Sequence, residues 1–133
     1  MQRIAVDTNI LVRLFVADDL PQQAAALEIL EAAQSVAVPT TVFVETVWVL
    51  TRAYKLPAEA VLRQLQNFVE SVPGLIVNRD ESDAGFAMMA RNGDFADGIN
   101  EFSGQKLGAA CFVTFDKKAA KLLAAQDREV RLL

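Results

Sequence analysis

The feature that most constrains the fold is the alternation of short apolar runs with longer helical stretches along the whole chain. Short apolar runs predict strands at residues 3–6, 36–38, 75–77 and 111–115 and around Val130. The β-branched residues of segment 42–54 leave it ambiguous between helix and strand, and its length favours a buried helix. Strands that alternate with helices indicate an α/β layer fold with a mainly parallel sheet.

Helical spacing of apolar residues, with capping and breaking residues, places the helices between these strands. We expect Asp18 or Asp19 to cap the second helix, Thr40 or Thr41 the third and Asp80 the fifth. The expected helices lie at about residues 10–15, 20–33, 42–54, 57–70, 80–91, 94–106 and 117–125.

The length of 133 residues favours a single domain spanning residues 1–133. Its one cysteine, Cys111, lies in the apolar run ACFVTF, so we expect a buried, inert thiol, as suits a reducing cytosol. We find no targeting segment and no apolar run long enough for a membrane span, and therefore expect a cytoplasmic protein that does not bind membranes.

The absence of histidine restricts the chemistry more than any other count in the composition. With no His and one Cys, the chain has no His-based triad, no imidazole ligand and no His/Cys zinc site. A net charge of −4 argues against a broad basic face for nucleic acid, but not against a nuclease whose metal ion supplies positive charge.

Acidic residues follow the predicted strands at the edge where a parallel α/β sheet collects its catalytic groups. Asp7 and Asp116 come directly after strands, and Glu45 lies early in the helix after the second strand. Asp97 opens a helix that runs back along the fourth strand and returns its start to the same edge. Four carboxylates are therefore expected at one rim.

Each acid also has a structural explanation. Asp7, Asp94 and Asp116 are suitable helix caps, and Asp97 would occupy a first helical turn, where negative charge is favoured. Glu45 is expected to be buried and to need a cation, either a metal or a structural Arg or Lys. Its apolar neighbours are expected in the core: Phe43, Val44, Val47, Trp48 and Leu50.

Four carboxylates at one rim would repel one another unless a divalent cation neutralised them. Ligation by oxygen alone suits Mg2+ or Mn2+. Such an ion lowers the pKa of a bound water, which provides a hydrolytic nucleophile without histidine. The residues themselves thus indicate metal-dependent hydrolysis of a phosphodiester.

Four segments, in this order, resemble PIN-domain ribonucleases, and more narrowly the VapC toxins of prokaryotic type II toxin–antitoxin pairs. They are VDTNILVRLF, VETVWVL, GDFADGINEFSGQKLGA and FVTFDKK, within a resemblance from Ile4 to about Leu122. The resemblance implies a PIN-like three-layer α/β/α fold, Mg2+-dependent endoribonuclease activity, a homodimer, and inhibition by a VapB antitoxin.

The resemblance also implies which residues of this chain correspond to the family's site. The four acids take the catalytic and metal-binding positions, with Asp7 and Asp97 as direct ligands and Asp94 as an auxiliary acid. Thr8, Asn9 and Thr114 match polar positions that support the site, Asn9 by hydrogen-bonding a carboxylate and Thr114 by facing the substrate. The pair Asn100-Glu101 departs from many members, and Glu101 adds an acid beside the site.

Basic residues near the rim are candidates for contacts with RNA phosphates. They are Lys117, Lys118 and Lys121, together with Arg13. For the three lysines the alternative is an ordinary solvated helix face.

Two other functions fit part of the pattern. An aspartyl phosphatase would use Asp7 as nucleophile but wants a second Asp where this chain has Asn9. A catalytically silent PIN-like interaction module would keep the fold, although none of the four acids is missing. We therefore expect a VapC-type endoribonuclease that cleaves RNA with a metal-activated water.

Overall fold

The computed structural model describes all of residues 1–133, and the chain divides into two compact units. The N-terminal unit comprises residues 1–78 and the C-terminal unit residues 79–133. No helix in either unit is long and apolar enough to cross a membrane.

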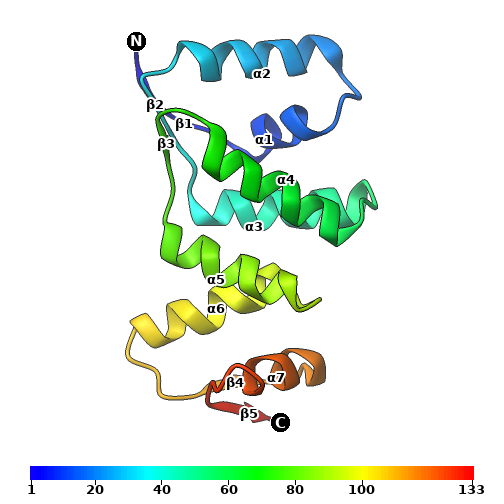
Figure 1. The fold of residues 1–133 in the computed structure, drawn as a ribbon, viewed down its shortest axis with the longest axis vertical. Helices are drawn as coiled ribbons and strands as arrows, with labels where there is room; N and C mark the ends of the chain where they lie inside the picture. The colour runs from blue at the N-terminus through cyan, green and yellow to red at the C-terminus, as the bar shows by residue number, and fades with distance from the viewer. The chain divides into compact units, whose positions relative to one another are not determined.

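The N-terminal unit is built on a parallel sheet of three short strands in the order β1-β2-β3 (Figure 1). The strands are β1 (Arg3–Ala5), β2 (Ser35–Ala37) and β3 (Leu75–Ile76). Val36 is central: it pairs with Ile4 and Leu75 and is 1% exposed. The parallel pairing confirms the α/β prediction and places the carboxyl ends of these strands at one edge.

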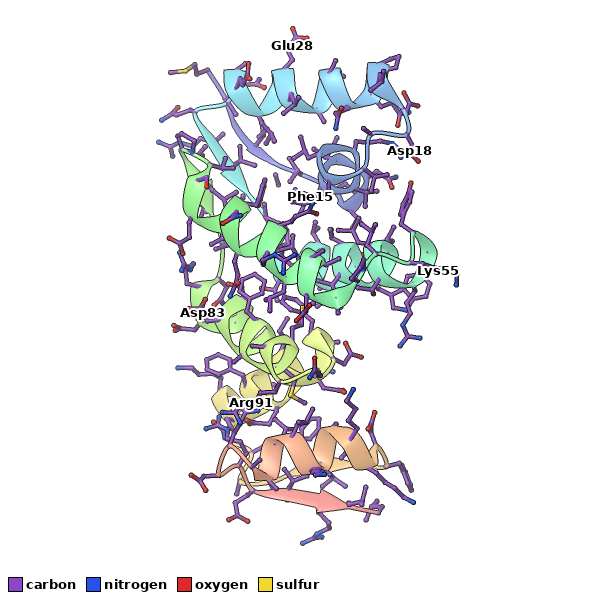
Figure 2. The ribbon with its side chains drawn as sticks, turned by 45° about the vertical axis from the view of Figure 1, so that its right-hand side comes forward. Phe15, Asp18, Glu28, Lys55, Asp83 and Arg91 are labelled. Atoms are coloured by element: carbon purple, nitrogen blue, oxygen red, sulfur yellow. The ribbon has the colours of Figure 1, made fainter.

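Four α-helices and one π-helical turn complete this unit: α1 (Thr8–Phe15), α2 (Leu20–Ala32), α3 (Thr40–Trp48), η1 (Val49–Ala53) and α4 (Ala58–Ser71). Its core contains fully buried side chains from α1, α3, η1 and α4, among them Leu11, Phe43, Leu50 and Leu65. Phe15 of α1 packs edge-on against Phe68 of α4, with ring centroids 5.7 Å apart. On α2, by contrast, Glu28 points away from the unit (Figure 2).

The caps of the second and third helices show one prediction confirmed and one wrong. Asp19 caps α2, and its carboxylate accepts a hydrogen bond from the Gln22 N–H at 3.1 Å. At α3 the cap position is Pro39, with no side-chain cap bond, and Thr40 is already helical. The fixed backbone torsion of proline sets the start of α3 without a capping hydroxyl.

The C-terminal unit consists of α5 (Arg79–Ala90), α6 (Phe95–Lys106), β4 (Phe112–Thr114), α7 (Lys117–Ala124) and β5 (Val130–Leu132). β4 and β5 pair in parallel (Figure 1). α5 and α6 pack closely because Gly98 has no side chain: a Cβ there would lie 2.5 Å from the Ala84 carbonyl oxygen. Asp80 lies in the first turn of α5, so its expected capping role was wrong.

Two expectations about burial were also wrong. Cys111 is exposed, because β4 begins only at Phe112 and the thiol belongs to the preceding connection. Trp48, expected in the core, is 60% exposed. It lies on the face of α3 opposite the buried Val42, Phe43, Thr46 and Val47.

Candidate active site

Asp7 stands at the carboxyl edge of the N-terminal sheet. The Val6 N–H donates to the Ala37 carbonyl at 3.2 Å, so Asp7 leaves the sheet beside the end of β2. Asp7 also caps α1, and its Oδ1 accepts a hydrogen bond from the Thr8 N–H at 2.7 Å. Its Oδ2 makes no hydrogen bond within the chain.

Glu45 starts from the same edge, because α3 begins directly after β2. It is the sixth residue of α3, which places it about 7.5 Å along the helix from Thr40. The side chain is exposed and forms no ion pair with Lys or Arg, so the predicted burial was wrong. The helical period explains the error: the apolar neighbours of Glu45 turn inward while Glu45 itself faces outward.

In the C-terminal unit, Asp94 and Asp97 lie at the start of α6. Asp94 is the exposed cap, and its Oδ1 accepts from the Ala96 N–H at 3.1 Å. Asp97 follows in the first turn and is half-buried, next to Gly98, where α6 lies tightly against α5. The close helix packing removes water from one side of the Asp97 carboxylate.

Asp116 caps α7 and is reached from β4 through a short connection. Its Oδ1 accepts from the Ala119 N–H at 3.0 Å, while its own N–H donates to Thr114 Oγ1 at 3.0 Å. Thr114 therefore fixes the backbone that carries Asp116. Rotation of either side chain, Thr114 or Asp116, would break one of these hydrogen bonds.

Electrostatics connect the three acids of the C-terminal unit. Burial raises the pKa of Asp97 above its usual range, and the negative charges of Asp94 and Asp116 raise it further. No Lys or Arg pairs with any of the three carboxylates. Negative charge is therefore concentrated around Asp97 without a cation from the protein.

These carboxylates fit a hydrated divalent ion better than a metal cage. No group of three or more acidic or cysteine side chains is arranged to hold one ion. Mg2+ commonly keeps several waters and takes only one or two carboxylates from the protein. Three of the carboxylates use one oxygen to cap a helix: Asp7, Asp94 and Asp116. The capping bond fixes the side chain and leaves the other oxygen without a hydrogen bond.

The two polar neighbours of Asp7 differ in their surroundings. Thr8 is 6% exposed, and its Oγ1 has no hydrogen-bond partner. Asn9 is exposed, and its side chain makes no hydrogen bond with a carboxylate of the chain.

The four basic candidates separate into two groups. Lys117, Lys118 and Lys121 are exposed on α7 beside Asp116 and form no ion pair. Arg13 is instead engaged: its guanidinium donates to Asp18 at 2.9 Å and to the Tyr54 hydroxyl at 3.2 Å. We therefore carry forward only the lysines as phosphate contacts.

Glu101 plays a structural part that the sequence did not reveal. It is 5% exposed and forms an ion pair with Arg128, which also donates to Gln105. The pair ties α6 to the segment just before β5. Because its partner is 27 residues away, no local sequence pattern indicated it.

Comparison with known protein families bears on the fold of the chain. Residues 4–124 match the family model of the PIN domain, a span that includes residues of both units. No curated protein matches the chain. With the parallel strands, the family match confirms the predicted PIN-like three-layer α/β/α fold class.

Proposed function

This chain belongs to the PIN domain family, whose members are typically metal-dependent nucleases, and on that premise we propose that it is a VapC-type endoribonuclease. In the proposal, residues 1–133 act as a single PIN domain that hydrolyses RNA phosphodiester bonds with Mg2+ or Mn2+. Asp7, Glu45, Asp97 and Asp116 are its catalytic acids, and Asp94 is auxiliary.

The observation that carries the proposal is the uncompensated charge at the start of α6. Asp94 and Asp116 lie near enough to act on Asp97, and none of the three has a cationic partner. A carboxylate kept purely for stability is normally paired or hydrogen-bonded so as to favour its charged form. An acid whose charged form is disfavoured, as that of Asp97 is, is best accounted for by a cation that binds there.

Each residue then has a defined part. A divalent ion lowers the pKa of a water molecule and neutralises charge on the phosphoryl oxygens. Asp7 and Asp97 are the carboxylates that would hold such an ion, and Glu45 or Asp116 would orient the attacking water. Thr114 holds Asp116 in place through the backbone bond described above. Lys117, Lys118 and Lys121 bind phosphates of the RNA, since their ammonium groups are exposed and unpaired.

The toxin role adds three further proposals: a homodimer, a cognate VapB-type antitoxin, and a cytoplasmic location. An adjacent upstream reading frame for a small DNA-binding protein would support the antitoxin. Co-purification of its product with this chain, with loss of ribonuclease activity in the complex, tests that proposal directly.

RNA cleavage by purified protein tests the activity. We expect cleavage with Mg2+, none with a chelator, and none with Asp7→Asn. Glu28→Gln is a matched control, because Glu28 is an exposed acid that points away from the N-terminal unit (Figure 2). Equal cleavage by wild type and Asp7→Asn would assign the activity to a contaminant and favour a catalytically silent PIN-like module.

A further inference from the structure

The outward face of α3 and η1 carries three residues with different chemistry, which we call the outer strip: Glu45, Trp48 and Arg52. All three are exposed, and Trp48, at 60%, is the largest exposed side chain of α3. The other exposed positions of α3, Thr41 and Glu45, are polar. Trp48 is therefore the only exposed apolar side chain of α3.

The π-helical turn places Arg52 on the same face of the helix as Trp48. η1 begins directly after Trp48, and its wider turn is closed by the Tyr54 N–H, which donates to the Val49 carbonyl at 3.0 Å. Because a π turn takes more residues than an α turn, Arg52 lies nearly in line with Trp48 along the helix. η1 ends at Ala53, and Lys55, with a φ of 56°, follows it at the same end of the unit as Asp18 (Figure 2).

The side chains of Arg52 and Trp48 have no polar partner within the protein. Arg52 forms no ion pair, and the indole N–H of Trp48 makes no hydrogen bond within the chain. Trp48 lies about 4.5 Å along the helix from Glu45, since each residue advances an α-helix by about 1.5 Å. An exposed flat ring, a free guanidinium and a proposed catalytic acid thus follow one another on one face.

From this juxtaposition we infer that the outer strip binds single-stranded RNA, with one unpaired base stacked on Trp48 and a neighbouring phosphate on Arg52. A single strand offers both an exposed base face and an adjacent phosphate, whereas bases in a duplex are already stacked and paired. The inference rests on the proposed function, since it assumes that the RNA is cleaved at the end of the outer strip where Glu45 lies.

Trp48 is the only tryptophan of the chain, so its fluorescence reports on the strip alone. We would titrate the whole protein with a short single-stranded RNA oligonucleotide in a chelator, which prevents cleavage. Saturable quenching of the emission is expected, and polyphosphate at equal ionic strength should not produce it. Quenching by a protein that has no cleavage activity would support RNA binding by the outer strip and contradict the proposed catalysis. The two proposals can therefore fail independently.

Variants then separate binding from turnover where cleavage is observed. Trp48→Ala should raise KM about tenfold or more with kcat little changed, the effect expected for losing one stacked base. Trp48→Phe, which keeps a ring, should recover most of this loss. Arg52→Ala should raise KM and reduce its salt dependence, whereas Arg63→Ala, an exposed arginine on α4, should change neither.

Two outcomes would overturn the inference. One is an RNA-cleaving protein whose emission does not change on RNA binding. The other is a Trp48→Ala variant with an unchanged KM but a smaller sedimenting species, because Trp48 would then lie between protein chains.

Discussion

Asp18 in the N-terminal unit and Asp97 in the C-terminal unit are opposite cases of the same side chain. The Tyr54 hydroxyl donates to Asp18 at 2.8 Å, and Arg13 forms an ion pair with it at 2.9 Å. These partners, the Tyr54 hydrogen bond first, hold the pKa of Asp18 below its usual range. Burial and two like charges raise the pKa of Asp97 instead.

The difference separates an acid whose charge the protein itself stabilises from an acid whose charge it does not. Asp18, Arg13 and Tyr54 satisfy one another and connect the turn after α1 to the end of η1. Asp97 has no such partners, and the protein keeps it at some cost to its own stability. Even within α6 the contrast recurs, because Glu101, one turn beyond Asp97, is paired with Arg128.

The largest expected effect is on catalysis by Asp97→Asn. We expect the rate of RNA cleavage to fall about 100-fold or more, the scale on which positioned catalytic groups contribute. Asp18→Asn, the matched control from the other unit, should stay close to the wild-type rate. A comparable loss in both variants, measured with Mg2+ under single-turnover conditions, would erase the contrast between the two acids.

Arg128→Met should have the largest effect on stability. It leaves the Glu101 carboxylate buried without a cation, and breaking a buried pair costs about 3 kcal/mol or more, reduced here because Arg128 is partly exposed. Urea unfolding measures the loss. Arg128→Met with Glu101→Gln should regain much of it, and failure of that rescue would mean that the ion pair is not the cause.

Tyr54→Phe should have a smaller effect on stability. Removing the hydroxyl deletes the hydrogen bond to Asp18, which lowers the free energy of unfolding slightly because the bond is exposed to solvent, and leaves RNA cleavage unchanged. Thermal unfolding and the cleavage assay together test this. An inactive but stable variant would show that the Arg13–Asp18–Tyr54 network serves catalysis and not the fold.

The smallest effect is a difference in pH dependence, measured without metal. Folded Asp97 holds its proton more tightly than the unfolded chain does. Relative to Asp97→Asn, the wild-type protein is therefore stabilised most below pH 3.8, the ordinary pKa of an Asp carboxyl group. It loses this added stability as the pH rises through the raised pKa of Asp97.

Asp18 has the opposite sign. Its contribution is present above 3.8 and is lost as pH falls through its lowered pKa. Denaturant titrations across this range, with Asp97→Asn and Asp18→Asn as references, should show two curves of opposite slope. Parallel curves would contradict the assignment.

Local sequence signals predicted most of the secondary structure and its direction. Apolar runs, helix breakers and the Asp19 cap depend on neighbouring residues, so the element order and parallel strands followed from them. Asp7, Asp94 and Asp116 could be predicted as helix caps because they follow strands or precede helices. The Glu101–Arg128 pair and the Arg13–Asp18–Tyr54 network join distant segments, which no local pattern records.

The third helix shows where apolar content misleads. Its sequence is apolar on nearly every side, so Glu45 and Trp48 were both expected inside, yet both are exposed. A helical period did contain the answer: Thr41, Glu45 and Trp48 are spaced by four and three residues, the repeat of a single face. A polar residue within an apolar helix marks the face that turns outward.

Metal binding tests the central claim, that Asp97 lacks a cation which the protein takes from solution. Mn2+ titration followed by electron paramagnetic resonance reports the bound ion without requiring RNA. We expect wild type and Asp18→Asn to bind Mn2+ equally, and Asp97→Asn to bind it about tenfold or more weakly. Equal binding by Asp97→Asn and wild type, or no binding by wild type, would contradict the account.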